Sequence, residues 1–457
     1  MNEINCLRNI AYLVVGNEEG EVLRNVDMVI KEGMIHSIGH GICDNDDFSF
    51  IDASRWIIYP GLVNTHHHFF QAFFRNQPEF RWPEDVLSWI RRIYPLFAKL
   101  NESSFYHTAI ICIAELIKNG CTTAFDHQYC YPKHAGTYLV DRQFEAARLL
   151  GMRFVAGRGA NTLPPCEGGI VPAEMVESTS SFLRDVERLV KDYHSNAPGS
   201  MEQVVVAPCQ PVNCREQTFE ESFLLARESG IRFHTHLGEG ESPVMQKLHG
   251  IRSAEWMEKI GIFGSDVWVA HAWELDENEI ARLGELNIGV SHCPAPVFLV
   301  GEQVTDLRRM MLADIRIGLG VDGCASNDNS NLAECIRTAY FLQCLVASRR
   351  GYSAPDPEDY LKFATRGGAS LLGRSDIGEL SAGKCADLFA LNVDRLDTVG
   401  GLQAPSAIPA KLGIGGPTAM TMIHGRIVWR DGEFPGLDEG ALTEQARIEL
   451  SRITGAE

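Results

Sequence analysis

The sequence has little positive charge and no long apolar run. Lys and Arg total 41 against 60 Asp and Glu, which gives a formal net charge of -19. That balance argues against a nucleic-acid backbone or an anionic membrane surface as the partner. No apolar stretch is long enough to span a bilayer, and no basic segment with an apolar run follows Met1. We therefore expect a cytoplasmic protein that binds neither nucleic acid nor membrane.

Paired cysteine motifs and phosphate-binding loops are also missing. The 13 cysteines are scattered, and no Cys-x-x-Cys pair occurs. In a chain of 457 residues this pattern favours reduced, mostly buried thiols over a disulfide framework. The sequence has no Gly-rich cradle at a strand–helix junction, which disfavours a nucleotide phosphate as the ligand.

What the sequence does contain is a histidine cluster at the end of an apolar run. Residues 56–63 are apolar apart from Pro60-Gly61, and His66, His67 and His68 follow. On a strand, residues two apart point to the same side, so His66 and His68 can bind one ion while His67 faces away. The alternative is a polar strand end on which three histidines cluster by chance. Imidazole is a common ligand of zinc-like ions, and this favours a metal site.

Both ends of the chain have the pattern of short strands joined by tight turns. Lys31-Glu32-Gly33 separates two such strands near the N-terminus, and residues 386–391 and 421–429 repeat the pattern near the C-terminus. We predict a small β-sandwich domain built from both termini, residues 1–57 and 380–457.

The central part of the chain alternates between short apolar runs and stretches of helical spacing. Eight such runs occur, at residues 56–63, 121–126, 153–158, 204–208, 231–236, 267–271, 288–292 and 317–322. Alternating strands and helices imply a parallel sheet, and eight strands imply a closed barrel. We therefore predict an α/β fold with a (β/α)8 TIM-like barrel over residues 58–379.

Several predicted strands end on residues that bind metals or transfer protons. His236 ends the fifth strand, His271 the sixth and Asp322 the eighth. In such a barrel the carboxyl ends of all strands open on one face, where the active site lies. We therefore expect these residues to converge with the first-strand histidines.

Glu239 follows His236 by three positions. A carboxylate a few residues after a metal ligand can lie close to the metal without binding it. A residue that shuttles protons during catalysis must occupy such a position. The alternative is an acid at a helix start, favoured there by the helix dipole.

These residues follow the order of a known family. They are His66-x-His68, His236 with Glu239, His271 and Asp322. In this order they resemble the amidohydrolase superfamily, in its branch of aminohydrolases that deaminate heteroaromatic rings. Further matching segments are residues 60–66, 234–237, 270–271, 291–294, 320–323, 325–327 and 383–388. Within the branch, residues 64–68 with Gln71 are most similar to the 8-oxoguanine, isoxanthopterin and hydroxy-triazine deaminases.

The resemblance implies a cofactor, a set of roles and a reaction. It implies one divalent ion, Zn²⁺ or alternatively Fe²⁺, with the ligands His66, His68, His236 and Asp322. Asp322 would take the proton of the attacking water, Glu239 would protonate a ring nitrogen, and His271 would hold the attacking oxygen. The expected reaction is hydrolytic deamination of a free, 8-oxoguanine-like purine lactam. Isoxanthopterin or another pterin, a hydroxy-s-triazine and a nucleoside are the alternative substrates.

Two further side chains are candidates for binding the substrate. Gln71 carries a donor and an acceptor that suit a lactam edge, or it is an amide on a helix surface. Arg158 ends the third strand and could bind a ring carbonyl, or it pairs with Asp126 or another barrel acid. His127 and His292 are candidates for supporting the metal ligands from behind.

Other reactions on this scaffold stay open. Binuclear cyclic-amide hydrolases of the superfamily commonly use a lysine at the end of strand four, where this chain has Ala207-Pro208-Cys209. That difference disfavours a binuclear hydrolase, while dechlorination or N-dealkylation at a single metal remains possible. We also expect a homo-oligomer that acts on a small heterocyclic molecule.

Overall fold

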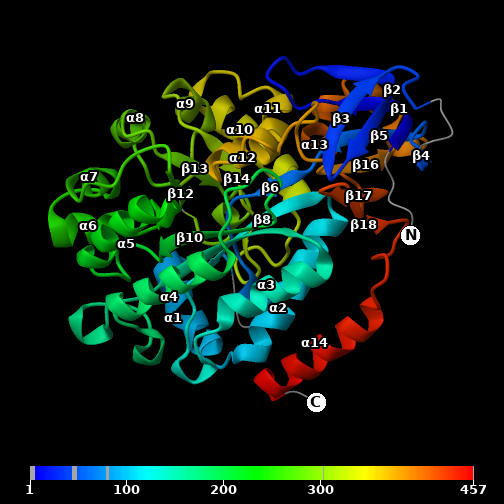
Figure 1. Ribbon diagram of the computed structural model, residues 1–457. Coiled ribbons are helices and arrows are strands. Elements are labelled where there is room, and N and C mark those ends of the chain that lie inside the picture. Colours follow the sequence, from blue (N-terminus) through cyan, green and yellow to red (C-terminus); the bar gives the residue numbers. More distant parts are fainter. Residues whose placement is uncertain (1–5, 44–48, 79–81, 302, 456–457) are drawn as a thin grey trace.

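Two β-structures share the chain, a closed barrel and an open sheet beside it (Figure 1). The structure is a computed structural model that describes residues 6–43, 49–78, 82–301 and 303–455. No helix in these ranges is both long and apolar enough to cross a membrane.

Eight parallel strands form the closed barrel, with β14 pairing to β6 to complete the ring. In chain order they are β6 (Leu62–Asn64), β8 (Cys121–Gln128), β9 (Arg153–Ala160), β10 (Glu202–Pro208), β11 (Arg232–Leu237), β12 (Val267–His271), β13 (Gly289–His292) and β14 (Ile317–Leu319). Each lies within or overlaps one of the eight predicted runs. The predicted α/β barrel is therefore confirmed.

The first predicted strand is divided at Gly61. Its first half, β5 (Trp56–Pro60), belongs to the open sheet, and only β6 enters the barrel. Gly61 N donates to the Asp387 carbonyl at 2.9 Å, and Leu62 N donates to the Gly120 carbonyl at 2.9 Å. A Cβ at Gly61 would overlap the side chain of Thr122, so only glycine fits where the chain passes from sheet to barrel.

The open sheet takes strands from both ends of the chain. Its order is β18-β17-β16-β5-β1-β2-β3, with β4 paired to β1. Its other strands are β1 (Cys6–Val14), β2 (Val22–Lys31), β3 (Met34–Gly39), β4 (Phe50–Asp52), β16 (Leu388–Asn392), β17 (Met420–Ile423) and β18 (Arg426–Arg430). β16 pairs antiparallel with β5, so the two ends of the chain meet in the middle of the sheet. A β-structure built from both termini is thus present.

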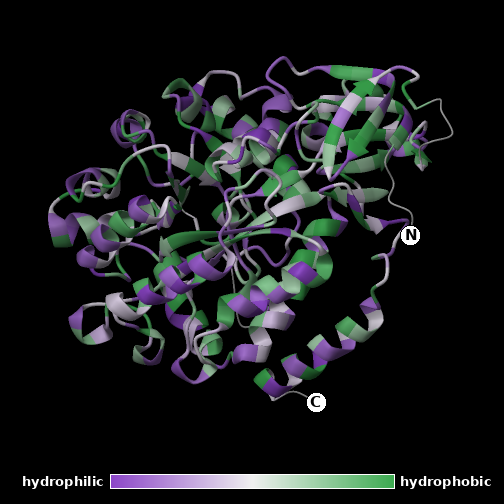
Figure 2. Cartoon of the chain, in the orientation of Figure 1, coloured by the Kyte–Doolittle hydropathy of each residue, from purple (hydrophilic) through white to green (hydrophobic). Residues whose placement is uncertain are grey.

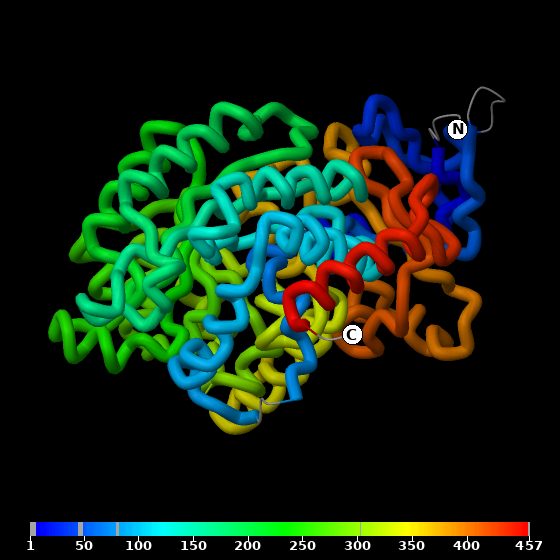
Figure 3. The backbone as a smooth tube through the Cα atoms, turned by 90° about the horizontal axis from the view of Figure 1, so that it is seen from below, coloured from blue at the N-terminus to red at the C-terminus, as the bar shows by residue number. Residues whose placement is uncertain are grey.

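Helices cover the outside of the barrel, and hydrophilic residues lie mainly on their outer faces (Figure 2). They are α1 (Val86–Phe97), α2 (Glu102–Lys118), α3 (Leu139–Leu150), α4 (Thr179–Tyr193), α5 (Glu216–Ser229), α6 (Ser242–His249), α7 (Ser253–Lys259), α8 (Glu277–Glu285), α9 (Leu307–Leu312), α10 (Leu332–Arg350), α11 (Pro357–Lys362), α12 (Gly368–Leu371), α13 (Ile408–Lys411) and α14 (Glu439–Thr454). The last, α14, returns from the sheet and packs against α2, where Asn101 Nδ2 and Ser104 Oγ donate to Glu449 at 2.9 and 3.1 Å (Figure 3).

One cysteine prediction is wrong. Cys6 and Cys43 form a disulfide, with their Cα atoms 6.8 Å apart. The two are 37 residues apart in sequence and carry no paired-cysteine motif, so only the folding of the N-terminal strands brings them together. The other eleven cysteines are free thiols, and all but Cys166 and Cys344 are buried, as expected.

A buried ion pair joins the barrel to the sheet. Arg153 at the start of β9 donates from Nε and Nη2 to the two carboxylate oxygens of Asp387, at 2.9 and 3.0 Å. Asp387→Ala should lower the free energy of unfolding by about 3–5 kcal/mol, because it leaves a buried guanidinium without its partner. Chemical denaturation measures this. Asp394→Ala removes an exposed partner of Arg55 and should cost under about 1 kcal/mol. Equal losses of unfolding free energy in the two variants would contradict the role of the Arg153–Asp387 pair in joining the barrel to the sheet.

Candidate active site

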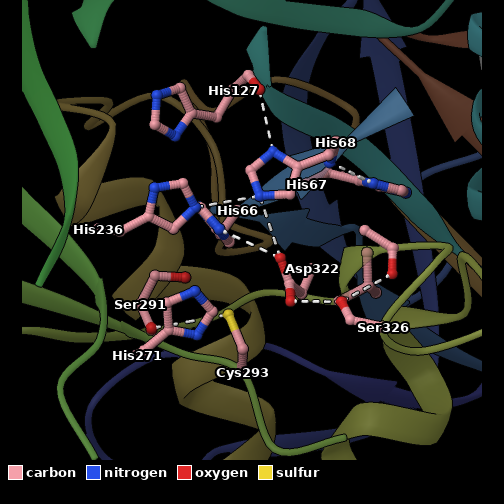
Figure 4. A network of polar contacts seen from close by, with 12 residues as sticks. His66, His67, His68, His127, His236, His271, Ser291, Cys293, Asp322 and Ser326 are labelled. Atoms are coloured by element: carbon pink, nitrogen blue, oxygen red, sulfur yellow. Dashed lines mark hydrogen bonds and ion pairs between the residues drawn. The ribbon is translucent and has the colours of Figure 1, made fainter. Parts of the chain in front are cut away.

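The predicted metal ligands converge at the carboxyl end of the barrel (Figure 4). A short parallel pair, β7 (His67–His68) with β15 (Asp322–Gly323), lies just beyond β6 and β14 and pairs Asp322 with His67. Across this pair the Asp322 carboxylate reaches the His68 ring. His236 comes from β11. These side chains are buried, so whatever they bind is shielded from bulk water.

The distances between the ligand atoms fit a single tetrahedral ion. His68 Nε2 lies 3.1 Å from His236 Nε2 and 3.1 Å from Asp322 Oδ1. His66 Nε2 lies 3.4 Å from the same Asp322 oxygen. Tetrahedral ligands at the usual zinc–nitrogen distance lie about 3.3 Å from one another. These three separations match the spacing between ligands of one metal ion.

Hydrogen bonds fix which nitrogen of each imidazole is free. His68 Nδ1 donates to the His127 carbonyl at 2.9 Å, and His236 Nδ1 donates to the Cys209 carbonyl at 2.6 Å. A neutral imidazole carries one proton, so both Nε2 atoms present lone pairs to the centre. Carbonyl partners of this kind are the usual support of metal-bound histidines.

His66 is oriented by a chain of two more bonds. His234 Nδ1 donates to the Trp268 carbonyl at 3.0 Å, which leaves His234 Nε2 as an acceptor. His66 Nδ1 donates to that nitrogen at 2.9 Å. His66 Nε2, buried and without a hydrogen-bond partner, is thereby left with its lone pair toward the centre. His234 thus orients the metal ligand His66. The sequence indicated this role only through the position of His234 two residues before His236.

The electrostatics of the cluster favour a cation. Burial lowers the pKa of His66 to about 3, against the opposing effect of Asp322, so this imidazole is neutral. Burial alone would raise the pKa of Asp322, but the polar contacts of its carboxylate with the His66 and His68 rings hold that pKa well below its usual range. Neutral imidazoles around one buried carboxylate leave a net negative charge that a divalent ion offsets.

Asp322 is held in an unusual backbone conformation. Its φ is +65° and that of His271 is +75°, a left-handed region that non-glycine residues rarely adopt. Ser326 Oγ donates to Asp322 Oδ2 at 2.8 Å and fixes the carboxylate. Such strain concentrates at functional sites, and here it turns both side chains toward the ligands.

Glu239 and His271 form a second pair beside the ligands. Glu239 Oε1 lies 3.3 Å from His271 Nε2. Burial raises the pKa of Glu239 well above its usual range, and the nearby charges of Asp322, Glu241 and Glu274 add to this. A carboxyl that stays protonated in this position can act as a general acid.

His67 faces away from the cluster, as strand alternation predicted. Its Nε2 lies 2.9 Å from Ser330 Oγ, and its Nδ1 accepts a hydrogen bond from His68 N at 2.7 Å. Both ring nitrogens are therefore engaged outside the metal centre.

The two predicted substrate-binding residues lie in different surroundings. Gln71 is buried beside the site, where its Oε1 accepts from Ala325 N at 3.1 Å. Arg158 instead points outward from β9, where it donates to Glu177 at 2.7 Å and to Asp185 at 2.8 Å. The alternative of an ion pair with barrel acids matches these contacts, although Asp126 is not among them. Substrate binding by Arg158 stays a prediction that requires these pairs to break.

Several contacts that hold the metal ligands in place could not be predicted from the sequence. His127 stacks on His236 with ring centroids 4.8 Å apart, and its carbonyl accepts the hydrogen bond from His68 Nδ1, which agrees with a supporting role. The Cys209 carbonyl, in a segment with no recognisable pattern, fixes His236. His292 is buried with neither ring nitrogen hydrogen-bonded, and burial lowers its pKa to about 4.

Fold and site together define a metal-dependent hydrolase on a (β/α)8 barrel. The imidazoles of His66, His68 and His236 form one group of potential metal ligands, and His66 forms a second with His271 and Asp322. The buried Glu239 carboxyl stands beside His271. The model of the amidohydrolase family matches residues 57–428. The chain belongs to this family, whose members bind a divalent metal ion, and it is a hydrolase acting on C–N bonds.

Three proteins illustrate the similarity. The chain is 51% identical over 451 residues to hydroxydechloroatrazine ethylaminohydrolase of Pseudomonas sp. (strain ADP), covering 96% of this chain and 94% of that one. It is 37% identical over 415 residues to 8-oxoguanine deaminase of Pseudomonas aeruginosa, covering 89% of each. A crystal structure of atrazine chlorohydrolase from Arthrobacter aurescens TC1 complexed with zinc has a TM-score of 0.92, with 25% identity over 97% of this chain and 99% of that one.

Proposed function

We propose that this amidohydrolase removes an amino or alkylamino group from a free heteroaromatic ring bearing a lactam or hydroxyl group. The observation that carries the proposal is the place of the buried Glu239 carboxyl, 3.3 Å from His271 Nε2 and beside the four ligand residues, where burial raises its pKa well above the usual range. An amine on an aromatic ring is displaced only after the ring becomes electrophilic, and protonation of a ring nitrogen achieves this. The 51% identity to an ethylaminohydrolase supports a hydroxy-s-triazine as the first candidate, ahead of 8-oxoguanine and isoxanthopterin.

The residues present supply the remaining steps. An ion held by His66, His68, His236 and Asp322 would act as a Lewis acid and lower the pKa of a water molecule. Asp322 accepts the water's proton at Oδ2, the oxygen that faces Ser326. Glu239 donates its proton from the carboxyl to the ring nitrogen, and His271 donates a hydrogen bond from Nε2 to the attacking oxygen. The departing amine takes the proton held by Asp322, and the hydroxyl proton returns to Glu239 as the ring carbonyl forms.

Side chains around the ligands provide a place for a flat ring. Tyr129 lies against His68 with ring centroids 4.9 Å apart, and Trp273 lies 4.8 Å from the His271 ring. Gln71 Nε2 is 3.5 Å from Tyr129 Oη, a long contact that leaves this donor available. We propose that Gln71 Nε2 binds the lactam or hydroxyl oxygen of the substrate.

A substrate panel tests the reaction. Alkylamino hydroxy-s-triazines, 8-oxoguanine and isoxanthopterin should release ammonia or alkylamine, while adenosine and cytidine should not, because a site that pairs with a lactam edge rejects ligands lacking it. Release is measured as free amine. A nucleoside as the best substrate would refute the free-base proposal and leave the hydrolase chemistry intact.

Gln71→Ala tests the substrate contact. It should raise KM or lower kcat about 3- to 10-fold, the worth of one hydrogen bond, without loss of metal. Gln217→Ala, on the exposed face of α5, is the matched control and should change neither. Unchanged kinetics in Gln71→Ala would remove it from the site.

Four broader points are also proposals. We infer that the ion is Zn²⁺, with Fe²⁺ as the alternative, and metal analysis of the purified protein tests this. We infer that the protein is a cytoplasmic homo-oligomer.

We also infer two domains, one of residues 1–57 with 380–457 and one of residues 58–379. The sheet built from both termini supports this division, although β5 extends the sheet to Pro60.

A further inference from the structure

The loop that carries Glu239 has a glycine on each side of it. Gly238 has φ of +69° and Gly240 has φ of +93°, both in the region that side-chain-bearing residues rarely adopt. Glycine loses more conformational freedom on ordering than any other residue, so such a loop needs contacts that hold it in one shape. The next acid, Glu241, is fully buried, and no step of the proposed reaction uses it.

Glu241 supplies those contacts through both carboxylate oxygens. Its Oε2 accepts from Glu239 N at 2.6 Å, and its Oε1 accepts from Gly238 N at 2.5 Å. Ser253 Oγ, at the start of α7, donates to the same Oε1 at 2.8 Å. Hydrogen bonds to a carboxylate are about twice as strong as those between neutral groups. The backbone of Glu239 is therefore tied to a helix that is not part of its own loop.

The other side of this loop is tied to the strand that carries His271. Ala272 N donates to the Leu237 carbonyl at 2.9 Å, and Glu274 N donates to the Gly238 carbonyl at 3.2 Å. Glu241 thus completes a frame in which the Glu239 and His271 segments have fixed relative positions.

We propose that Glu241 is a positioning residue, whose carboxylate locks the Gly238–Glu239 backbone and so places Glu239 against His271. A displacement of about 1 Å in a catalytic group can cost about 100-fold in rate, so loss of this lock should be visible in turnover. The kinetic part of this inference rests on the proposed function, while the order of the loop can be measured without any substrate.

Glu241→Gln is the decisive variant. A glutamine retains one acceptor oxygen but turns an NH2 group toward a backbone N–H, so at least one of the two backbone bonds is lost. We expect kcat to fall about 10- to 100-fold, with KM and metal content within about twofold of the wild type. Hydrogen exchange of the backbone amides over residues 237–242, followed by mass spectrometry, should become faster.

Glu274→Gln is the matched control. Glu274 is also an acid near Glu239, but its Oε2 accepts from Ser242 N at 3.1 Å and not from the Gly238 or Glu239 amides. Glu274→Gln should change kcat less than about threefold and leave the hydrogen exchange of the backbone amides of residues 237–239 unaltered. Equal losses in the two variants would show that charge matters rather than position, and would overturn the inference.

Ser253→Ala is a milder variant if Glu241→Gln does not fold. It removes one donor from Oε1 and should speed exchange of the same amides, with a smaller fall in kcat. Unchanged exchange and kcat in the variants that fold would overturn the role of Glu241. A wild-type protein inactive on the whole panel would instead refute the proposed function, and the exchange data would still decide the role of Glu241.

Discussion

His236→Ala and Asp322→Ala should each abolish turnover and lower the bound metal well below one ion per chain. Each variant removes one of four converging ligand side chains, in which His68 Nε2 lies 3.1 Å from both His236 Nε2 and Asp322 Oδ1, and His66 Nε2 lies 3.4 Å from that oxygen. Three remaining ligands hold a metal less tightly, and loss of Asp322 also removes the acceptor for the water's proton. Metal analysis and amine release measure the two effects.

His249→Ala is the control for the ligand variants. It removes an exposed histidine from α6 and should leave both metal content and rate unchanged. A His236 or Asp322 variant with full activity would refute the site. Full metal content without activity would show that the residue acts in the chemistry and not in binding the ion.

Glu239→Gln should retain the metal and lower the rate by about two to four orders of magnitude, the usual worth of general acid–base catalysis. A glutamine preserves shape and removes the titrating proton. Because burial and neighbouring charges raise the pKa of Glu239, the wild-type carboxyl holds that proton until the pH rises through the raised value. Activity that depends on this acid should therefore decline on the alkaline side in the wild type.

Glu255→Gln, on the exposed side of α7, controls for removal of one negative charge and should be fully active. Loss of metal from Glu239→Gln would make Glu239 a ligand, and the proton-transfer role would be wrong. A rate within about threefold of the wild type would remove Glu239 from the reaction.

The sequence alone determined the barrel and the residues at its mouth. Apolar runs and helical stretches alternate eight times, and a closed parallel barrel of eight strands brings the ends of strands one, five, six and eight to one face. Because successive side chains of a strand point to opposite sides, the sequence also predicted that His66 and His68 face the metal while His67 faces away. These inferences depend only on the spacing of residues along the chain, which can be read directly from the sequence.

The tertiary structure decided which atoms support the site. The Cys209 carbonyl behind His236, the His234 ring behind His66 and the Glu241 carboxylate under Glu239 are contacts between strands or loops. Arg158 belongs to the same class, since the side of β9 that it occupies decides whether it meets a substrate or the acids Glu177 and Asp185. Spacing in the sequence does not fix such contacts, because they depend on strand register and on side-chain rotamers.

The N-terminal disulfide shows the same limit. Nothing near Cys6 or Cys43 distinguishes them from the eleven free cysteines, and their pairing follows from how the first strands fold back on each other. The sequence thus determined which residues reach the active face, because strand and helix periods are local. The tertiary structure decided what holds each of them in place, because hydrogen bonds and ion pairs form between residues that only folding brings within about 3 Å.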